Sequence, residues 1–277
     1  MRADCHIHMV LDGIDWKASI ARGVADGHIR RVLEDYQKKG YTYLRDGGDR
    51  WGVGLRAKVL ARDYEITYRT PLAPLCLQGH YGSFIGLVYE NPRDYARLVQ
   101  QQRTRGADFV KIMVSGLMDF DRCGVLTEPP LEDRLITELI HIAHEEGMSV
   151  MAHCNGTRPA LAAAAAGVDS IEHGAYLEDE ALHAMVQMGV VWVPTLSTVG
   201  NLRNTDRYDE RSVEMILENT MLRVEKFRNL GGFIAPGTDA GAWAVPHGCQ
   251  TEEKLLAQAG VGQENLQRGI EIIKSKF

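Results

Sequence analysis

The sequence predicts an α/β fold in which residues 1–277 form a single (β/α)8 TIM-type barrel. Eight short runs with β-strand character recur along the chain, and helix-like stretches separate them, which is typical of parallel βαβ units. No G-x-G-x-x-G follows the first run, so an open dinucleotide-binding sheet is disfavoured. Eight alternating units match a closed barrel better than an open sheet.

The eight expected strands are distributed over the whole chain. In order, they are residues 4–10, 41–46, 71–78, 109–114, 149–153, 170–173, 190–196 and 233–238. Among the intervening segments, residues 131–146 show apolar positions at helical spacing, and Gly147 marks the end of that helix. The alanine run at 162–166 suits a helix that packs closely on a barrel. No linker, repeat or charge block divides the chain, so one domain is expected.

Composition narrows the class of protein. The chain is 45% hydrophobic and carries a formal net charge of -6 at pH 7, without a run of Lys or Arg. This balance argues against nucleic acid or an anionic membrane as a partner. The cysteines are scattered and never form C-x-x-C, which is typical of a reducing compartment. Few residues precede His6, and they include Arg2 and Asp4, so we expect no signal peptide and a cytoplasmic location.

The stretch Asp4-Cys5-His6-Ile7-His8 lies in the first predicted strand. Because side chains alternate along a strand, both imidazoles are expected on one face, with Cys5 and Ile7 on the other. Two histidines in this arrangement can chelate a metal ion. Taken alone, the pattern also fits a half-buried pair of histidines without a ligand.

Four more residues of ligand type lie in or just after later predicted strands: Lys111, His153, His173 and Asp239. Catalytic groups of barrels gather at the C-terminal strand ends. Imidazole and carboxylate groups suit zinc, with manganese or iron as alternatives. A protonated lysine would be repelled there, whereas a lysine that has reacted with carbon dioxide becomes a carbamate able to bridge two ions.

Together these motifs resemble the amidohydrolase superfamily, in its binuclear branch with a carboxylated lysine. The resemblance rests on D-x-H-x-H in the first strand and on V-K-I, M-A-H, I-E-H-G and G-T-D-A around the four later residues. Residues 111–116, 166–174 and 194–196 further resemble the prolidase and imidazolonepropionase-like members. The motifs span nearly the whole chain.

The resemblance implies a centre with two divalent metal ions. His6, His8 and Asp239 would hold the more buried ion. His153 and His173 would hold the more exposed one. Each ion would keep open positions for water and substrate.

Two further roles follow from the same resemblance. Lys111, as a carbamate, and a hydroxide would bridge the ions, leaving a residual positive charge to stabilise the oxyanion of a tetrahedral intermediate. Asp239 would also be catalytic, taking the proton of the hydroxide and passing it to the leaving amine. An alternative role for Asp239 is a helix N-cap.

Four residues are candidates for substrate binding, each with a structural alternative: His80, Tyr176, Arg45 and His247. Gly79-His80 resembles a substrate-contacting pair of related enzymes and could hold a carboxylate. Tyr176 would donate to the substrate carbonyl or merely pack. Arg45, followed by Asp46, would bind substrate or form a structural ion pair. The other histidines, at 28, 141, 144 and 183, lie on predicted helices and are interpreted as ordinary helix residues.

One departure from the family pattern concerns a small β-sandwich that flanks the barrel of related enzymes. Here the first metal motif stands almost at the start of the sequence, and mostly helix-like residues follow Asp239, so a barrel without the flanking sandwich is expected. Its uncovered surface is then a candidate contact for a partner subunit in a homo-oligomer.

The leading functional hypothesis is metal-dependent hydrolysis of an amide (C–N) bond by a metal-bridging hydroxide. The substrate would be a small molecule, a dipeptide or an N-acyl amino acid, with its carboxylate held by His80 or a nearby cation. Cyclic amides, lactones and phosphotriesters are alternative substrates. A catalytically inactive barrel that serves as a binding protein is the alternative from another class, although the complete ligand set argues against it.

Overall fold

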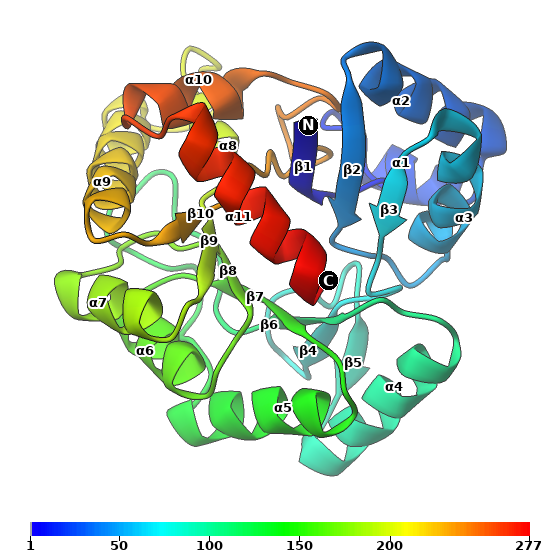
Figure 1. Cartoon of the computed structure of the whole chain (residues 1–277), viewed down its shortest axis with the longest axis horizontal. Helices are drawn as coiled ribbons and strands as arrows, with labels where there is room; N and C mark the ends of the chain where they lie inside the picture. The colour runs from blue at the N-terminus through cyan, green and yellow to red at the C-terminus, as the bar shows by residue number, and fades with distance from the viewer. Residues whose placement is uncertain (1) are drawn as a thin grey trace.

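The computed structural model describes residues 2–277. Strands and helices alternate along this part of the chain, and the helices form a ring around the strands (Figure 1). Every pair of neighbouring strands is parallel. The predicted α/β barrel class is therefore confirmed. Across the same residues, none of the helices combines the length and apolarity needed to cross a membrane.

The strands are short, and most lie within or near the predicted runs. They are β1 (Arg2–Ile7), β2 (Tyr41–Asp46), β3 (Thr67–Arg69), β4 (Leu75–Leu77), β5 (Leu87–Tyr89), β6 (Val110–Met113), β7 (Val150–Cys154), β8 (Ser170–His173), β9 (Val191–Val193) and β10 (Phe233–Ile234). All of them belong to two parallel sheets. Within residues 2–277 there is accordingly no flanking β-sandwich.

The helices occupy the outer layer. They are α1 (Trp16–Arg22), α2 (Asp26–Lys38), α3 (Val53–Leu60), the 3-10 helix η1 (Ala61–Tyr64), α4 (Pro92–Thr104), α5 (Asp133–Glu145), α6 (Thr157–Ala165), α7 (Asp179–Gln187), α8 (Ser197–Gly200), α9 (Glu210–Asn229), α10 (Thr251–Gln258) and α11 (Gln263–Lys276). Helix α4 shows how the sequence sets a boundary, since the side chain of Asn91 accepts hydrogen bonds from the amides of Arg93 and Asp94 and Pro92 occupies the first turn.

The two sheets close into a ring through backbone hydrogen bonds. Their orders are β1-β2-β3 and β10-β9-β8-β7-β6-β4-β5. On one side, the amide of Cys5 in β1 donates to the carbonyl of Pro236, just after β10, over 2.8 Å. On the other, the amide of Asp108, just before β6, donates to the carbonyl of Thr70, just after β3, over 2.9 Å. The strand ends therefore converge on one face of a barrel.

The third strand differs from the prediction. The sequence indicated one strand over residues 71–78. In the structure, two short strands take the place of the third barrel strand: β3 pairs with β2, and β4 pairs with β6. Pro71 and Pro74 lie between them, and proline cannot donate a ladder hydrogen bond, so the strand is interrupted. Strand β5, which pairs with β4, was not predicted because its apolar run is only three residues long.

Strand β1 contains an irregularity that reverses part of the predicted alternation. Its register with β2 shifts between Asp4 and Ile7. Cys5 packs in the barrel interior with Phe109, while Ile7 packs in the cluster between β1 and the outer helices. The expectation that Cys5 and Ile7 share a face is therefore wrong, because a register shift of this kind turns one residue to the opposite side.

Helix α11 closes the N-terminal end of the barrel. In Figure 1 it crosses the centre of the molecule over the strands. Ile270, Ile273 and Phe277 belong to the apolar cluster in the barrel interior. Ser149, which immediately precedes β7, donates its hydroxyl to the carbonyl of Lys276. With this end sealed, the opposite, C-terminal end is the one open to a ligand.

Candidate metal and active site

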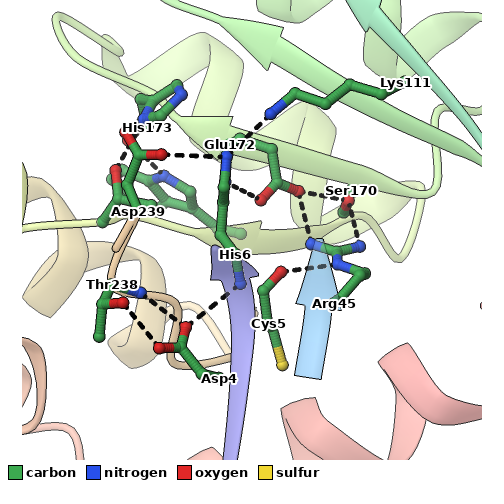
Figure 2. Close-up of polar contacts among 12 residues, drawn as sticks. Asp4, Cys5, His6, Arg45, Lys111, Ser170, Glu172, His173, Thr238 and Asp239 are labelled. Carbon is green, nitrogen blue, oxygen red and sulfur yellow. Dashed lines mark hydrogen bonds and ion pairs between the residues drawn. The ribbon is translucent and has the colours of Figure 1, made fainter. Parts of the chain in front are cut away.

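The ligand-type side chains predicted from the sequence gather at the C-terminal strand ends. His6 lies in β1, Lys111 in β6 and His173 at the end of β8, and Figure 2 shows them with Asp239 around one centre. His8 and His153 line the same cavity as Lys111, His173 and Asp239. The structure thus brings together the full set: His6, His8, Lys111, His153, His173 and Asp239.

His6, His8 and Asp239 form the tightest group. The Nε2 atoms of His6 and His8 lie 3.4 and 3.3 Å from Oδ1 of Asp239, and one ligand atom from each residue lies within 4.8 Å of the others. Within residues 2–277, this buried Oδ1 has no hydrogen-bond partner. Because buried carboxylate oxygens are nearly always satisfied, a cation is the fitting partner. These three residues fit a divalent metal ion.

His153 and His173 form a second group next to the first. Their ring centroids lie 4.5 Å apart. Nδ1 of His173 hydrogen-bonds the Thr195 hydroxyl over 2.7 Å, which leaves Nε2 for a ligand. Nε2 of His153 lies 3.2 Å from the carbonyl of Gly116, which leaves its Nδ1 available to bind a metal ion. Lys111 connects the two groups, with Nζ 2.8 Å from Nε2 of His6.

Burial controls ionisation in this centre. It lowers the pKa of His6 and of His153 well below the ordinary value, that of His173 to about 4, and that of Lys111 to about 8. Neutral imidazoles and a neutral amine offer the lone pairs that metal binding and carbamate formation need. Burial by itself would raise the pKa of Asp239, but the neighbouring histidines and Lys111 outweigh it and hold that pKa below its ordinary value.

A buried carboxylate contacts the second ring nitrogen of His6. Oε2 of Glu172 lies 2.8 Å from Nδ1 of His6, while Oε1 accepts from Arg45 Nη2 at 2.7 Å and from the Ser170 hydroxyl at 2.6 Å (Figure 2). Burial raises the pKa of Glu172, whereas the charges of Arg45 and Lys111 oppose that shift. The Arg45 and Ser170 donors, with the charge of Lys111 nearby, favour the ionised form of Glu172. An ionised Glu172 accepts from a protonated Nδ1 of His6, which is the tautomer that presents Nε2 to the site.

Asp4 ties the start of the first motif to the loop that carries Asp239. Its two oxygens accept from the Thr238 amide over 2.9 Å and from the Thr238 hydroxyl over 2.6 Å. Burial raises the pKa of Asp4 to about 6. The first residue of D-x-H-x-H therefore fixes the position of Thr238, the neighbour of the candidate ligand Asp239.

The backbone at three strand ends is strained. His173, Thr195 and Asp239 have φ values of 66°, 49° and 56°. Left-handed conformations of this kind are unfavourable for residues other than glycine and occur preferentially at functional sites. No helix begins at Asp239, since the next one, α10, starts at Thr251, so the N-cap alternative is not observed.

A cavity of about 470 Å³ opens onto these side chains. Its floor includes Lys111, His173 and Asp239. Its walls come from loops after the strands and are mainly apolar. The aromatic members of the wall are Trp16, Tyr81, Phe84, Phe120, Tyr208 and Trp243.

None of the four predicted substrate contacts lies in this wall. His80 stands beside it, with Nδ1 3.6 Å from Glu128, and the following residue, Tyr81, lines the cavity instead. Tyr176 packs against the main apolar core, so its packing alternative is the one observed. The four histidines assigned to helices do lie on α2, α5 and α7.

Arg45 and His247 are held by other contacts. Arg45 is fully buried beneath the ligands and forms its ion pair with Glu172, not with Asp46. Nε2 of His247 lies 2.9 Å from the carbonyl of Leu11, and Nδ1 lies 3.4 Å from the Tyr36 hydroxyl. Both side chains thus have structural partners, and neither is among the residues that line the cavity, so substrate binding by either stays a prediction.

Sequence reasoning missed two features of the site. Glu172 was noted only as part of I-E-H-G, although a charged residue inside a short strand is itself a signal of a buried partner. The aromatic residues of the wall were not noted at all. Their signal is the placement of Trp, Tyr and Phe in loops that follow strand ends, where exposed aromatic residues indicate binding.

Fold and site together define a barrel that carries a histidine, aspartate and lysine ligand set at its open end. A family model described as "Amidohydrolase family" matches residues 4–270. The protein belongs to the amidohydrolase family, as the sequence motifs predicted.

Individual relatives are more distant. A Mycobacterium tuberculosis protein, described as uncharacterized, is 30% identical over 166 residues, which is 58% of this chain and 44% of that protein. The Aspergillus niger ochratoxinase is 29% identical over 123 residues, 44% of this chain and 25% of that enzyme. The matched part of the chain thus spans less than half the length of these relatives.

The similarity in fold is more extensive than the similarity in sequence. A crystal structure of a Xaa-Pro dipeptidase with bound methionine has a TM-score of 0.81 at 20% identity, over 99% of this chain and 75% of that one. The structure of A. niger ochratoxinase has a TM-score of 0.76 at 20% identity, over 99% and 69%. These values establish a shared barrel fold.

Proposed function

We propose that the protein is a metal-dependent hydrolase that cleaves an amide bond. Family membership supports hydrolysis. The observation that carries the proposal is the position of Asp239 Oδ1, which lies 3.4 and 3.3 Å from Nε2 of His6 and His8 and has no hydrogen-bond partner within residues 2–277. His6, His8 and Asp239 would hold one divalent ion, and His153 and His173 the other. Zinc is the favoured metal, with manganese or iron as alternatives. When bound, such ions lower the pKa of water and polarise an amide carbonyl.

Lys111 would join the two ion sites. Its amine reacts with carbon dioxide, forming a C–N bond and releasing one proton, and the product is a carbamate with two oxygen ligands. Because burial lowers the pKa of Lys111 to about 8, the neutral amine that this reaction needs is accessible near neutral pH. The resulting anion also removes the repulsion that an ammonium would exert in a cation site.

Asp239 would move the proton during hydrolysis. Its side chain lines the cavity and its pKa lies below the ordinary value, so it is a carboxylate able to accept a proton from the attacking water. The same group can then deliver that proton to the amide nitrogen as the C–N bond breaks. Glu172 would keep His6 in the tautomer that has Nε2 free.

The amide class has support from the relatives as well as from the site. The fold is shared with a Xaa-Pro dipeptidase, which favours an amide over a lactone or a phosphotriester. The complete ligand set argues against an inactive binding barrel. The sequence-based hypothesis of a carboxylate held by His80 has no support from the cavity, whose wall does not include that residue.

A direct test uses protein produced with ample zinc. We expect about two metal equivalents per chain by elemental analysis, and hydrolysis of amides that stops after chelation and returns with zinc or manganese. The Asp239→Asn variant should lose at least about 100-fold in kcat, because proton transfer contributes this much or more. Metal-free protein that hydrolyses amides at the full rate, or Asp239→Asn with unchanged kcat, would refute the proposal.

A further inference from the structure

Two groups of aromatic rings form the cavity wall on different loops. The first contains Trp16, at the start of α1, with Tyr81 and Phe84 from the β4–β5 connection. The ring centroids of Trp16 and Phe84 lie 5.9 Å apart in an edge-on arrangement, and those of Tyr81 and Phe84 also lie 5.9 Å apart. Edge-on and tilted contacts of this kind hold rings in defined orientations.

The second group contains Phe120, Tyr208 and Trp243, from the loops after β6, α8 and β10. The centroids of Phe120 and Tyr208 lie 5.2 Å apart, and those of Tyr208 and Trp243 lie 6.2 Å apart. Three loops distant in sequence therefore contribute rings to one apolar surface. These rings pack against the main apolar core on one side and line the cavity on the other.

The aromatic surface begins directly at the ligand group. The ring of Tyr81 lies 4.9 Å from the ring of His153. On the other side, Trp243 follows Asp239 closely in a loop in which the Ala242 amide donates to the Asp239 carbonyl over 3.0 Å. An amide whose carbonyl lies at the ligands would thus place its neighbouring groups against aromatic rings.

Charged groups are scarce in this wall. Among the described residues that line it, the only lysine or arginine is Lys111, which belongs to the ligand group. Lys17 and Arg207 lie over the rings of Trp16 and Trp243, at 5.6 and 4.0 Å, but neither lines the cavity. A carboxylate placed against the aromatic wall, away from the metal-binding residues proposed above, would lose its hydration without gaining an ion pair from a lysine or arginine that lines the wall.

The cavity and its mouth are large enough for a bulky group. A volume of about 470 Å³ lies within the range of small-molecule sites. At the mouth, Ile14 is 80% exposed and Trp16 50% exposed, and both line the cavity. Large apolar residues exposed beside a cavity indicate a surface that a ligand covers.

We infer that the substrate is a neutral amide that carries a bulky aromatic group, and that the two aromatic groups of the wall bind this group. The inference rests on the proposed amide hydrolysis and adds the class of substrate. It departs from the dipeptide or N-acyl amino acid expected from the sequence, because those substrates carry a carboxylate.

Matched substrates separate the inference from the proposed function. The set consists of N-benzoyl-phenylalaninamide, which is neutral and aromatic, N-benzoyl-phenylalanine, which adds a carboxylate, and N-acetyl-glycinamide, which is neutral and small. We expect kcat/KM for the first to exceed each of the others by at least about 10-fold. Equal or faster hydrolysis of the acid or the small amide would overturn the inference and leave the proposed function standing.

A binding measurement does not depend on turnover. N-benzoyl-phenylalaninamide should bind to the metal-free protein and change its tryptophan fluorescence, with at least about 5-fold weaker binding in Trp16→Ala and in Trp243→Ala. Leu222→Ala is the control, since Leu222 is exposed and lies outside the cavity wall. Thermal unfolding of each variant establishes that it is folded. Unchanged binding in both folded tryptophan variants would overturn the inference, whereas failure to hydrolyse any amide with normal binding would refute only the proposed function.

Discussion

Glu172 holds His6 through a contact of 2.8 Å between Oε2 and Nδ1, and neither side chain is exposed to solvent. Arg45 and Ser170 donate to the other oxygen, so the carboxylate has little freedom to turn. The opposite nitrogen of the imidazole, Nε2, is thereby directed toward Lys111 and Asp239. Glu172 is in this sense a positioning residue, which would act on a bound metal through His6.

The first prediction concerns the Glu172→Gln variant. A neutral amide is a weaker acceptor for the Nδ1 hydrogen and leaves the charge of Arg45 uncompensated, so metal affinity should fall by about 10–100-fold. Competition with a chromophoric chelator measures this affinity directly. Glu253→Gln is the matched control, because Glu253 pairs with Arg2 at the surface. An affinity unchanged from the native protein would show that the contact does not orient His6.

The second prediction concerns Lys111→Ala. Without the bridging group, the variant should bind metal weakly and show little activity, and bicarbonate or short carboxylates should restore part of both by filling the gap. The competing interpretation is that Lys111 is a cation that binds a substrate carboxylate. Under that interpretation the variant would keep both metals and mainly raise KM. Two tightly bound ions in a metal titration of Lys111→Ala would exclude the carbamate.

The third prediction separates the two ion sites. His153 and His173 have adjacent rings, and Thr195 orients His173, so His173→Ala should lower the metal content by about half and nearly abolish turnover. His183→Ala is the control, since that histidine is exposed on α7, where its Nδ1 lies 2.7 Å from the carbonyl of Asp179, and it is not among the residues that line the cavity. Elemental analysis after gel filtration gives the metal content. A variant with the native metal content and activity would remove His173 from the site.

The parts of the fold that could be predicted are those fixed by local pattern. Residues 41–46 and 170–173 were expected as strands with the bounds that β2 and β8 have, because each is a short run that follows a turn-forming stretch. The prediction of one strand over residues 71–78 was wrong because two prolines divide the third strand of the barrel into two short strands. The prediction that Cys5 and Ile7 share a face was wrong because of the register shift between β1 and β2. Such a shift depends on the partner strand, and the alternation of residues within one strand carries no information about that partner.

The features of the candidate site also divide into those that local sequence predicts and those that depend on tertiary contacts. The gathering of the histidines, Lys111 and Asp239 at one end of the barrel could be predicted, since their type and their position at strand ends are both visible in the sequence. The ion pair of Arg45 could not be predicted, because its partner Glu172 lies in β8, which is not a neighbour of β2 in the sheets. The aromatic wall depends on how loops from five parts of the chain fold over one cavity, and loop conformations of this kind are set by tertiary contacts.

A buried carboxylate behind the site has a measurable effect on stability. Glu252 of α10 accepts a hydrogen bond from the Ser197 amide over 2.7 Å, while its Oε1 has no partner within residues 2–277. Ser197 in turn donates its hydroxyl to the carbonyl of Thr238, next to Asp239. Burial raises the pKa of Glu252 from 4.5 to about 8. The folded protein therefore keeps a proton on Glu252 that the unfolded chain releases.

This difference sets the direction of the fourth prediction. Because the folded state binds more protons between pH 4.5 and about 8, its free energy of unfolding should decrease as the pH rises through that window. The loss attributable to Glu252 should be on the order of a few kcal/mol. Glu252→Gln carries no titrating group, so its stability should fall less between about pH 5.5 and about pH 8. Urea unfolding of both proteins at the two pH values measures the difference. If native protein and variant lose the same stability over this range, the proton does not reside on Glu252.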